Sequence, residues 1–138
     1  MKTSKYTNSA YSDIGLLILR VFLGLSMCFG HGLGKWNNLF SGEEIQFADP
    51  FGIGALPSLA MAVFAEVICS ILLALGLLTR WILIPLIVTM LVAVFIVHVS
   101  DGFGVMEKAL LYGIGYMTIL FTGPGRFSID AFLKSKNK

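Results

Sequence analysis

The sequence predicts an all-α integral membrane protein, a four-helix bundle that forms a single domain over residues 1–138. Of its 138 residues, 57% are hydrophobic, whereas about 45–50% is usual in soluble domains. Charged residues make up only 13% of the chain, and the mean hydropathy is +0.85. A soluble domain of 15.0 kDa has too little interior to bury that much apolar surface. Helices are expected because lipid cannot hydrogen-bond to an exposed backbone.

Four membrane helices are expected in chain order. A membrane helix needs about 20 mostly apolar residues. Three stretches meet this requirement clearly: residues 14–33, 58–78 and 81–99. A fourth, about residues 105–122, starts with Glu107 and Lys108, and we expect its charged end to lie among lipid headgroups. The alternative for this segment is a re-entrant or buried helix. Pro85 is expected within the first turn or so of the third helix, where proline is tolerated.

The distribution of Lys and Arg predicts that both termini are cytoplasmic. One side of the bundle carries seven of them: Lys2, Lys5, Arg80, Arg126, Lys134, Lys136 and Lys138. The other side carries only Lys35 and Lys108. This imbalance follows the positive-inside rule.

The connections between helices are unequal in length. Helices two and three are joined through Thr79-Arg80, so they are expected to be antiparallel neighbours. The loop of residues 34–57 is long and rich in aromatic residues, and we expect it to form a lid over the outer end of the bundle. The tail of residues 128–138 is expected to be a short amphipathic helix, capped by Ser128, at the membrane surface.

Small residues within the helices are expected to serve packing. The glycines concerned are Gly24, Gly30, Gly32 and Gly34 in or just beyond the first helix, and Gly113 and Gly115 in the fourth. Among them, Gly30 and Gly34 have the G-x-x-x-G spacing that lets membrane helices approach closely. Cys28 and Cys69 should differ in depth by roughly 9 Å at about 1.5 Å per residue. This difference disfavours a disulfide, and we expect both to be apolar packing residues. Because the first 13 residues are polar and the apolar stretch after them is long, no cleavable signal peptide is expected.

Two charged residues lie inside the first and second predicted helices, away from the helix ends, where each costs at least about 2.5–3.5 kcal/mol to insert. Arg20 lies in the cytoplasmic half of the first helix and Glu66 lies in the second. One interpretation is a buried ion pair that locks these two helices together. The other is a functional site, with Glu66 and Arg20 as candidate catalytic residues on a proton path or beneath a polar ligand. Burial and a nearby arginine act on the pKa of a carboxyl group in opposite directions, so both interpretations stay open.

A second polar group is expected at the outer ends of the helices. His31 and Lys35 are four residues apart, and His98 ends the third helix beneath the predicted lid. With Trp36 they could hold a quinone, whose two carbonyls need donors and whose ring needs an apolar slot. His31 and His98 could instead be axial haem ligands, although nothing else indicates haem. A zinc site needs more ligands than these, so no metal site is expected.

Several short motifs along the chain resemble those of the DoxX family of small four-span membrane proteins. They are Leu19-Arg20, Leu23-Gly24, His31-Gly32-Leu33-Gly34-Lys35-Trp36, Phe64-Ala65-Glu66, Ala74-Leu75-Gly76-Leu77-Leu78-Thr79-Arg80 and Thr122-Gly123-Pro124-Gly125-Arg126-Phe127-Ser128-Ile129-Asp130. The resemblance implies a four-helix bundle and an association with quinone-linked oxidoreductase systems. It transfers no catalytic role, so the matching positions are motif residues only.

Together these observations lead to one main functional hypothesis and two alternatives. The main hypothesis is a redox accessory protein of the bacterial inner membrane that binds a quinone or quinol near the outer face. Because the sequence supplies no electron carrier, a partner oxidoreductase would be needed. The first alternative is a scaffold or assembly factor without enzymatic activity. The second is a small-molecule carrier, which four short helices without an inverted repeat make less attractive unless they oligomerise.

Overall fold

The computed structural model describes residues 7–136, and its regular elements there are all helical. In chain order they are α1 (Thr7–Met27), η1 (Cys28–Gly32), α2 (Leu33–Leu39), α3 (Ala55–Val63), η2 (Phe64–Cys69), α4 (Ser70–Leu75), α5 (Thr79–Val92), η3 (Ala93–Val97), α6 (Phe103–Thr122) and α7 (Ile129–Lys136). The elements η1, η2 and η3 are π-helical turns within longer helices. Lys2, Lys5 and Lys138, which contribute to the predicted orientation, lie outside the described residues.

Three helical segments among the described residues are long and apolar enough to cross a membrane: Ala10–Leu39, Ala55–Leu75 and Thr79–Val97. The predicted membrane-helix character of the first three segments is therefore confirmed. Segment α6 has 20 residues but carries Glu107 and Lys108, and its role as a fourth span stays a prediction. The short turn before Thr79 makes α4 and α5 neighbours, as expected.

Most helices extend beyond their predicted boundaries, although the second and third end early, at Leu75 and Val97 instead of residues 78 and 99. The first helix continues six residues past the predicted end at Leu33, because the stretch up to Leu39 contains no proline and packs against α3. The other three begin at Ala55, Thr79 and Phe103, two or three residues early. Hydropathy detects the apolar part of a helix but not its polar end turns. The loop therefore spans residues 40–54 instead of 34–57, and Pro85 lies inside α5 rather than in its first turn.

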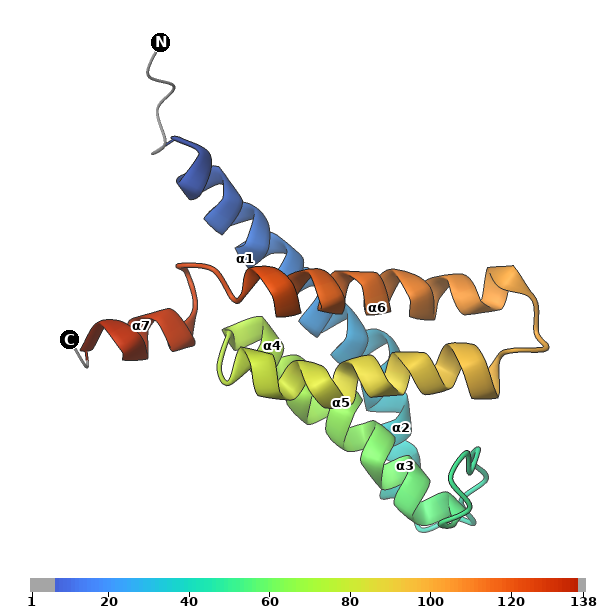
Figure 1. Ribbon diagram of the computed structural model, residues 1–138. Helices are drawn as coiled ribbons and strands as arrows, with labels where there is room; N and C mark the ends of the chain where they lie inside the picture. Colours follow the sequence, from blue (N-terminus) through green and yellow to red (C-terminus); the bar gives the residue numbers. More distant parts are fainter. Residues whose placement is uncertain (1–6, 137–138) are drawn as a thin grey trace.

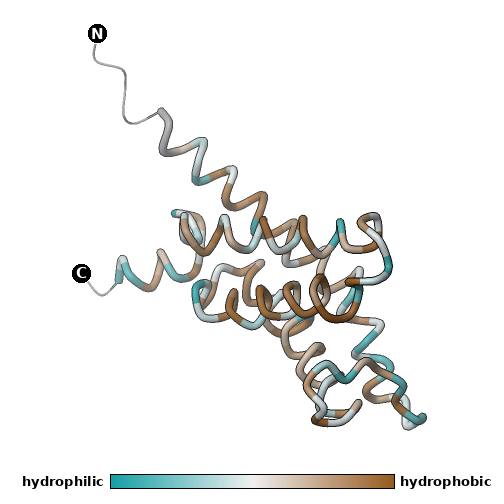
Figure 2. Tube along the Cα trace, turned by 45° about the vertical axis from the view of Figure 1, so that its right-hand side comes forward, coloured by the Kyte–Doolittle hydropathy of each residue, from teal (hydrophilic) through white to brown (hydrophobic). Residues whose placement is uncertain are grey.

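The helices form two packed pairs that cross each other (Figure 1). Segment α1 packs mainly along α4, and α5 packs along α6. The start of α1, the turn between α4 and α5, and α7 lie on one side, which we call the terminal end (Figure 1). The loop of residues 40–54 and the turn between α5 and α6 lie on the other, which we call the loop end. Figure 2 shows apolar residues along the helices and hydrophilic ones mainly at both ends.

The packing role expected of the glycines is confirmed for Gly24 and Gly32 but not for the Gly30 and Gly34 pair. A Cβ atom at Gly24 would lie 2.5 Å from the Ser70 carbonyl oxygen, and one at Gly32 would lie 2.6 Å from the Glu66 carbonyl oxygen. In contrast, nothing lies within 4 Å of a Cβ atom built at Gly30 or Gly34. The prediction that Gly30 and Gly34 let helices approach closely is wrong within this chain, because both face outward. Gly24 and Gly32 have that role.

Candidate functional site

Arg20 does not pair with Glu66, and the predicted ion pair between them is wrong. Arg20 is 1% exposed, and its guanidinium donates hydrogen bonds to three carbonyl oxygens: those of Leu73 (3.2 Å), Ala74 (2.8 Å) and Phe127 (2.6 Å). The carbonyls of residues 73 and 74 belong to the last turn of α4, where a helix leaves its acceptors unpaired and its dipole attracts positive charge. Arg20 therefore joins the end of α4 to the segment before α7.

Two carboxylates, Asp13 and Asp130, form further hydrogen bonds at the terminal end, and together with those of Arg20 we call them the Arg20 network. Asp130 accepts hydrogen bonds from the amides of Leu78 (2.8 Å) and Thr79 (2.9 Å), and Asp13 accepts one from the Arg126 amide (3.0 Å). Leu78 has a φ of 52°, a left-handed conformation that is unfavourable for a leucine. Burial alone would raise the pKa of Asp130, but the hydrogen bonds from Thr79 and Leu78 hold the pKa below its usual value. The network closes the turn between α4 and α5.

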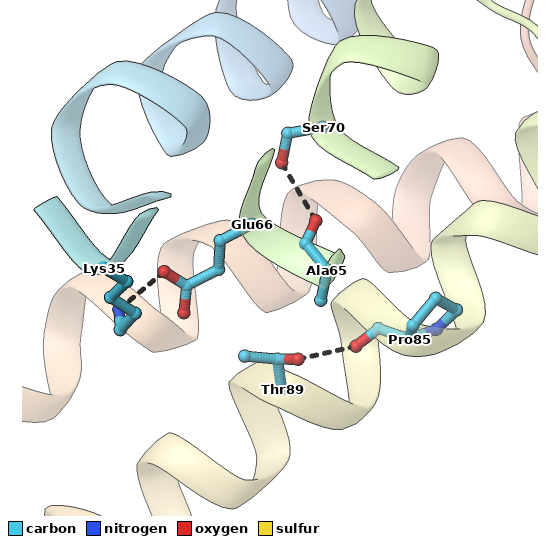
Figure 3. Close-up of polar contacts among 6 residues, drawn as sticks. All are labelled: Lys35, Ala65, Glu66, Ser70, Pro85 and Thr89. Carbon is cyan, nitrogen blue, oxygen red and sulfur yellow. Dashed lines mark hydrogen bonds and ion pairs between the residues drawn. The ribbon is translucent and has the colours of Figure 1, made fainter. Parts of the chain in front are cut away.

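The buried carboxylate of Glu66 pairs with Lys35 instead (Figure 3). The Lys35 Nζ atom lies 2.5 Å from a Glu66 carboxylate oxygen, and the Glu66 side chain is 6% exposed. Lys35 reaches this position because α1 continues through η1 into α2 beyond its predicted end. The pair consists of two side chains that keep further donor and acceptor capacity, so it can still bind a ligand.

A cavity of about 500 Å³ adjoins the Lys35–Glu66 pair. It lies between α3 with η2 on one side and α5 with η3 on the other, and the loop of residues 40–54 covers it. Its polar side chains include Lys35, Glu66 and His98, and most of the remaining lining is apolar. Thr89 also lines it, but the Thr89 hydroxyl already donates to the Pro85 carbonyl at 2.8 Å (Figure 3). An apolar cavity with a few polar groups is typical of a small-molecule site.

The three π-helical turns are each close to one of these polar residues. Glu66 lies within η2, His98 directly follows η3, and Lys35 lies three residues after η1. Such turns are rare and often occur at functional sites, because one inserted residue rotates the side chains that follow it. Their position here indicates that the backbone is adapted to bring these three side chains to the cavity.

The structure separates the other predicted site residues. His98 lines the cavity, and its Nδ1 atom lies 2.7 Å from an Asp101 carboxylate oxygen. His31 instead packs edge-on against Tyr112, with ring centroids 5.7 Å apart. Trp36 packs against Phe40. His31, Trp36 and Arg20 do not line this cavity.

The loop of residues 40–54 covers the cavity and is held at its far end by Asp49. The Asp49 carboxylate accepts hydrogen bonds from the amides of Ile53 (3.0 Å) and Gly54 (2.8 Å), and from the Ser58 hydroxyl (2.9 Å). These hydrogen bonds hold the pKa of Asp49 below its usual value, and the bond from the Gly54 amide has the largest effect. Phe47 and Phe51 from this loop line the cavity. The predicted lid therefore has a structural counterpart, shorter than expected.

Sequence reasoning missed two residues that organise these regions. Asp49 was not singled out, although an aspartate before Pro-Phe-Gly is a recognisable turn signal. Asp130 was noted only within a family motif. Its hydrogen bonds to Leu78 and Thr79 join segments more than 50 residues apart, and no local pattern indicates them. The predicted cap on α7 is confirmed, because the Ala131 amide donates to the Ser128 hydroxyl at 3.2 Å.

Comparison with known proteins gives two matches. The DoxX family model matches residues 15–99. A protein of Haemophilus influenzae, described only as an uncharacterized protein, is 32% identical over 130 residues, which cover 89% of this chain and 85% of that protein. No solved structure matches.

Proposed function

The chain belongs to the DoxX family, and from this premise we propose that it binds a quinone or quinol headgroup in the cavity beside Lys35 and Glu66. The observation that carries the proposal is the cavity itself, which combines an apolar lining with the buried Glu66 carboxylate and its partly buried partner Lys35 at one side. A quinone ring fits an apolar slot, and its carbonyl oxygens need donors. The Lys35 ammonium is a donor for one carbonyl, and His98 offers a second polar contact.

In this proposal Glu66 handles protons and Arg20 has no direct part. Reduction of a quinone to a quinol consumes two electrons and two protons. Glu66 is the carboxylate beside the proposed headgroup, so it is the residue of this chain that would exchange a proton with it. The electrons would come from a partner oxidoreductase, since the side chains of Lys35, Glu66 and His98 are not electron carriers. Arg20 uses its Nη1 and Nη2 donors on backbone carbonyls that do not belong to the cavity lining.

The proposal also includes the location and orientation of the protein. We place it in the bacterial inner membrane as a four-span protein, with α6 as the fourth span and the terminal end in the cytoplasm. The positive-inside bias supports this orientation, because Arg80, Arg126, Lys134 and Lys136 lie at the terminal end of the described chain and Lys35 and Lys108 lie towards the loop end. The cavity then lies towards the outer face.

Quinone content of the purified protein tests the proposal. The full chain is purified in mild detergent, its organic extract is analysed by mass spectrometry, and added quinone is titrated against the protein. Wild type is expected to bind about one quinone per chain. Lys35→Met and Glu66→Gln should each weaken binding by about tenfold or more, since a hydrogen bond to a charged group contributes about 1.5–3 kcal/mol.

Lys108→Met is the matched control, because Lys108 is the other lysine of the loop end but does not line the cavity. Binding by this variant should equal that of wild type, and the thermal midpoints of all variants are measured in parallel. Wild type that binds no quinone would overturn the proposal and favour the scaffold alternative. Equal binding by Glu66→Gln, Lys35→Met and Lys108→Met would also contradict it.

A further inference from the structure

The cavity has an apolar side that faces away from the protein. Several of its lining residues are also exposed: Met61 is 52%, Phe64 is 53% and Val88 is 45% exposed. Met61 and Phe64 come from α3 and η2, whereas Val88 comes from α5. These three residues therefore border an opening between the two helices, which we call the side opening.

The side opening follows from how the two helices diverge. Segment α5 packs against η2 but makes few contacts with α3. Figure 1 shows α3 and α5 separating towards the loop end. The loop of residues 40–54 covers the cavity from that end with Phe47 and Phe51, so the gap between α3 and α5 is left at the side of the bundle.

The depth of the side opening determines which solvent it meets. Phe64 and Val88 lie near the middle of the membrane-crossing segments Ala55–Leu75 and Thr79–Val97. In a bilayer about 30 Å of hydrocarbon surrounds such segments, so exposed residues at their centres contact acyl chains and not water. The cavity thus meets lipid at the side opening and the Lys35–Glu66 pair at its polar end.

From this arrangement we infer that the ligand reaches the cavity from the lipid phase, through the side opening between α3 and α5. The ligand class is a lipid-soluble amphiphile, with its polar head at Lys35 and Glu66 and its hydrocarbon chain leaving past Met61, Phe64 and Val88. The inference rests on the proposed function for the headgroup. The route itself depends only on the position of the side opening.

A bulky side chain at the side opening tests the route. Val88→Trp should weaken binding of a quinone with a long isoprenoid chain by about tenfold or more, because the added ring overlaps the path of the chain. The affinity for the same headgroup without a chain should stay within about threefold of the wild-type value, a smaller change than the tenfold loss expected for the long-chain quinone. Ile84→Trp is the matched control, since Ile84 is exposed one turn earlier on α5 and does not line the cavity. It should change neither affinity.

The outcomes separate this inference from the proposed function. Equal effects of Val88→Trp on the two quinones, or none on either, would overturn the side route while leaving quinone binding in place. If wild type binds neither quinone, the headgroup assignment fails, and phospholipids with a photoactivatable group in the acyl chain decide the route. Labelling of cavity residues such as Ala62 and Ala93 that falls in Val88→Trp but not in Ile84→Trp would support it. Labelling that Val88→Trp leaves unchanged would refute it.

Discussion

The Arg20 network and the Lys35–Glu66 pair both hold buried charge within membrane helices, but they satisfy it differently. Arg20 donates to three backbone carbonyls and does not line the cavity. Glu66 meets one side chain and lies beside about 500 Å³ of free volume. Backbone carbonyls cannot be exchanged for a ligand without opening a helix end, whereas a lysine can shift to a new partner. The comparison indicates that Arg20 stabilises the fold and that the pair is available for binding.

The largest effect that this comparison predicts is the loss of Arg20. Arg20→Met removes charged donors from three carbonyls, each such hydrogen bond contributing about 1.5–3 kcal/mol. We expect the free energy of unfolding in mixed detergent micelles to fall by at least about 3 kcal/mol. Arg20→Lys should recover part of it, since one ammonium cannot reproduce the two-nitrogen geometry. A destabilisation of Glu66→Gln as large as that of Arg20→Met would break the distinction between the two regions.

Glycine substitutions should have effects of intermediate size on stability, and their effects on quinone binding should distinguish the two regions. Gly24→Ala brings a Cβ atom against Ser70 and Ala74, and Gly32→Ala brings one against the backbone of Glu66. Both should lower stability by about 1–3 kcal/mol. Only Gly32→Ala should also weaken quinone binding, because its clash displaces the residue that lines the cavity. Gly30→Ala and Gly34→Ala serve as controls with open space, and loss of stability in either would show that an outward face is packed against another chain.

The smallest effect is expected at Asp130 and depends on pH. Asp130→Ala removes the acceptor for two amides at the start of α5 and should cost about 1 kcal/mol, while Asp130→Asn should cost less because it keeps one acceptor oxygen. The pKa of Asp130 is lower in the folded chain than its ordinary value of about 3.9. Its contribution is therefore present above about pH 4 and is lost as the pH falls through the folded value.

The measurement is the unfolding free energy of wild type and Asp130→Ala across about pH 3 to 7, the range around the ordinary pKa of aspartate. The difference between the two proteins should be constant near neutral pH and should shrink at the acid end. A difference that grows towards low pH would mean that the folded pKa is raised, contrary to the hydrogen bonds from Leu78 and Thr79. Quinone binding should not change, because Asp130 lies at the terminal end.

Much of the fold could be predicted from local patterns. Long apolar stretches identified three helices long and apolar enough to cross a membrane, and the Thr79-Arg80 turn identified the second and third of them as neighbours. The lid and the cap at Ser128 also followed from nearby residues. Helix ends were less accurate, since the stretch through Leu39 is polar enough to resemble a loop. The π-helical turns left no recognisable pattern, although they lie beside the polar residues of the cavity.

The sequence by itself determined that the chain is a helical membrane protein and that Arg20 and Glu66 each need a polar partner, since hydrocarbon supplies none. It also placed Lys35 and His98 at the same end of the bundle. Only the tertiary structure decided which groups become partners. Spacing along a helix gives the depth of a residue, but the π-helical turns and the close approach at Gly24 and Gly32 set which way each side chain faces. The contact of Gly32 with the Glu66 backbone places Lys35, about one turn further along, beside the Glu66 carboxylate. It leaves Arg20 twelve residues away from that contact, at the open carbonyls of α4.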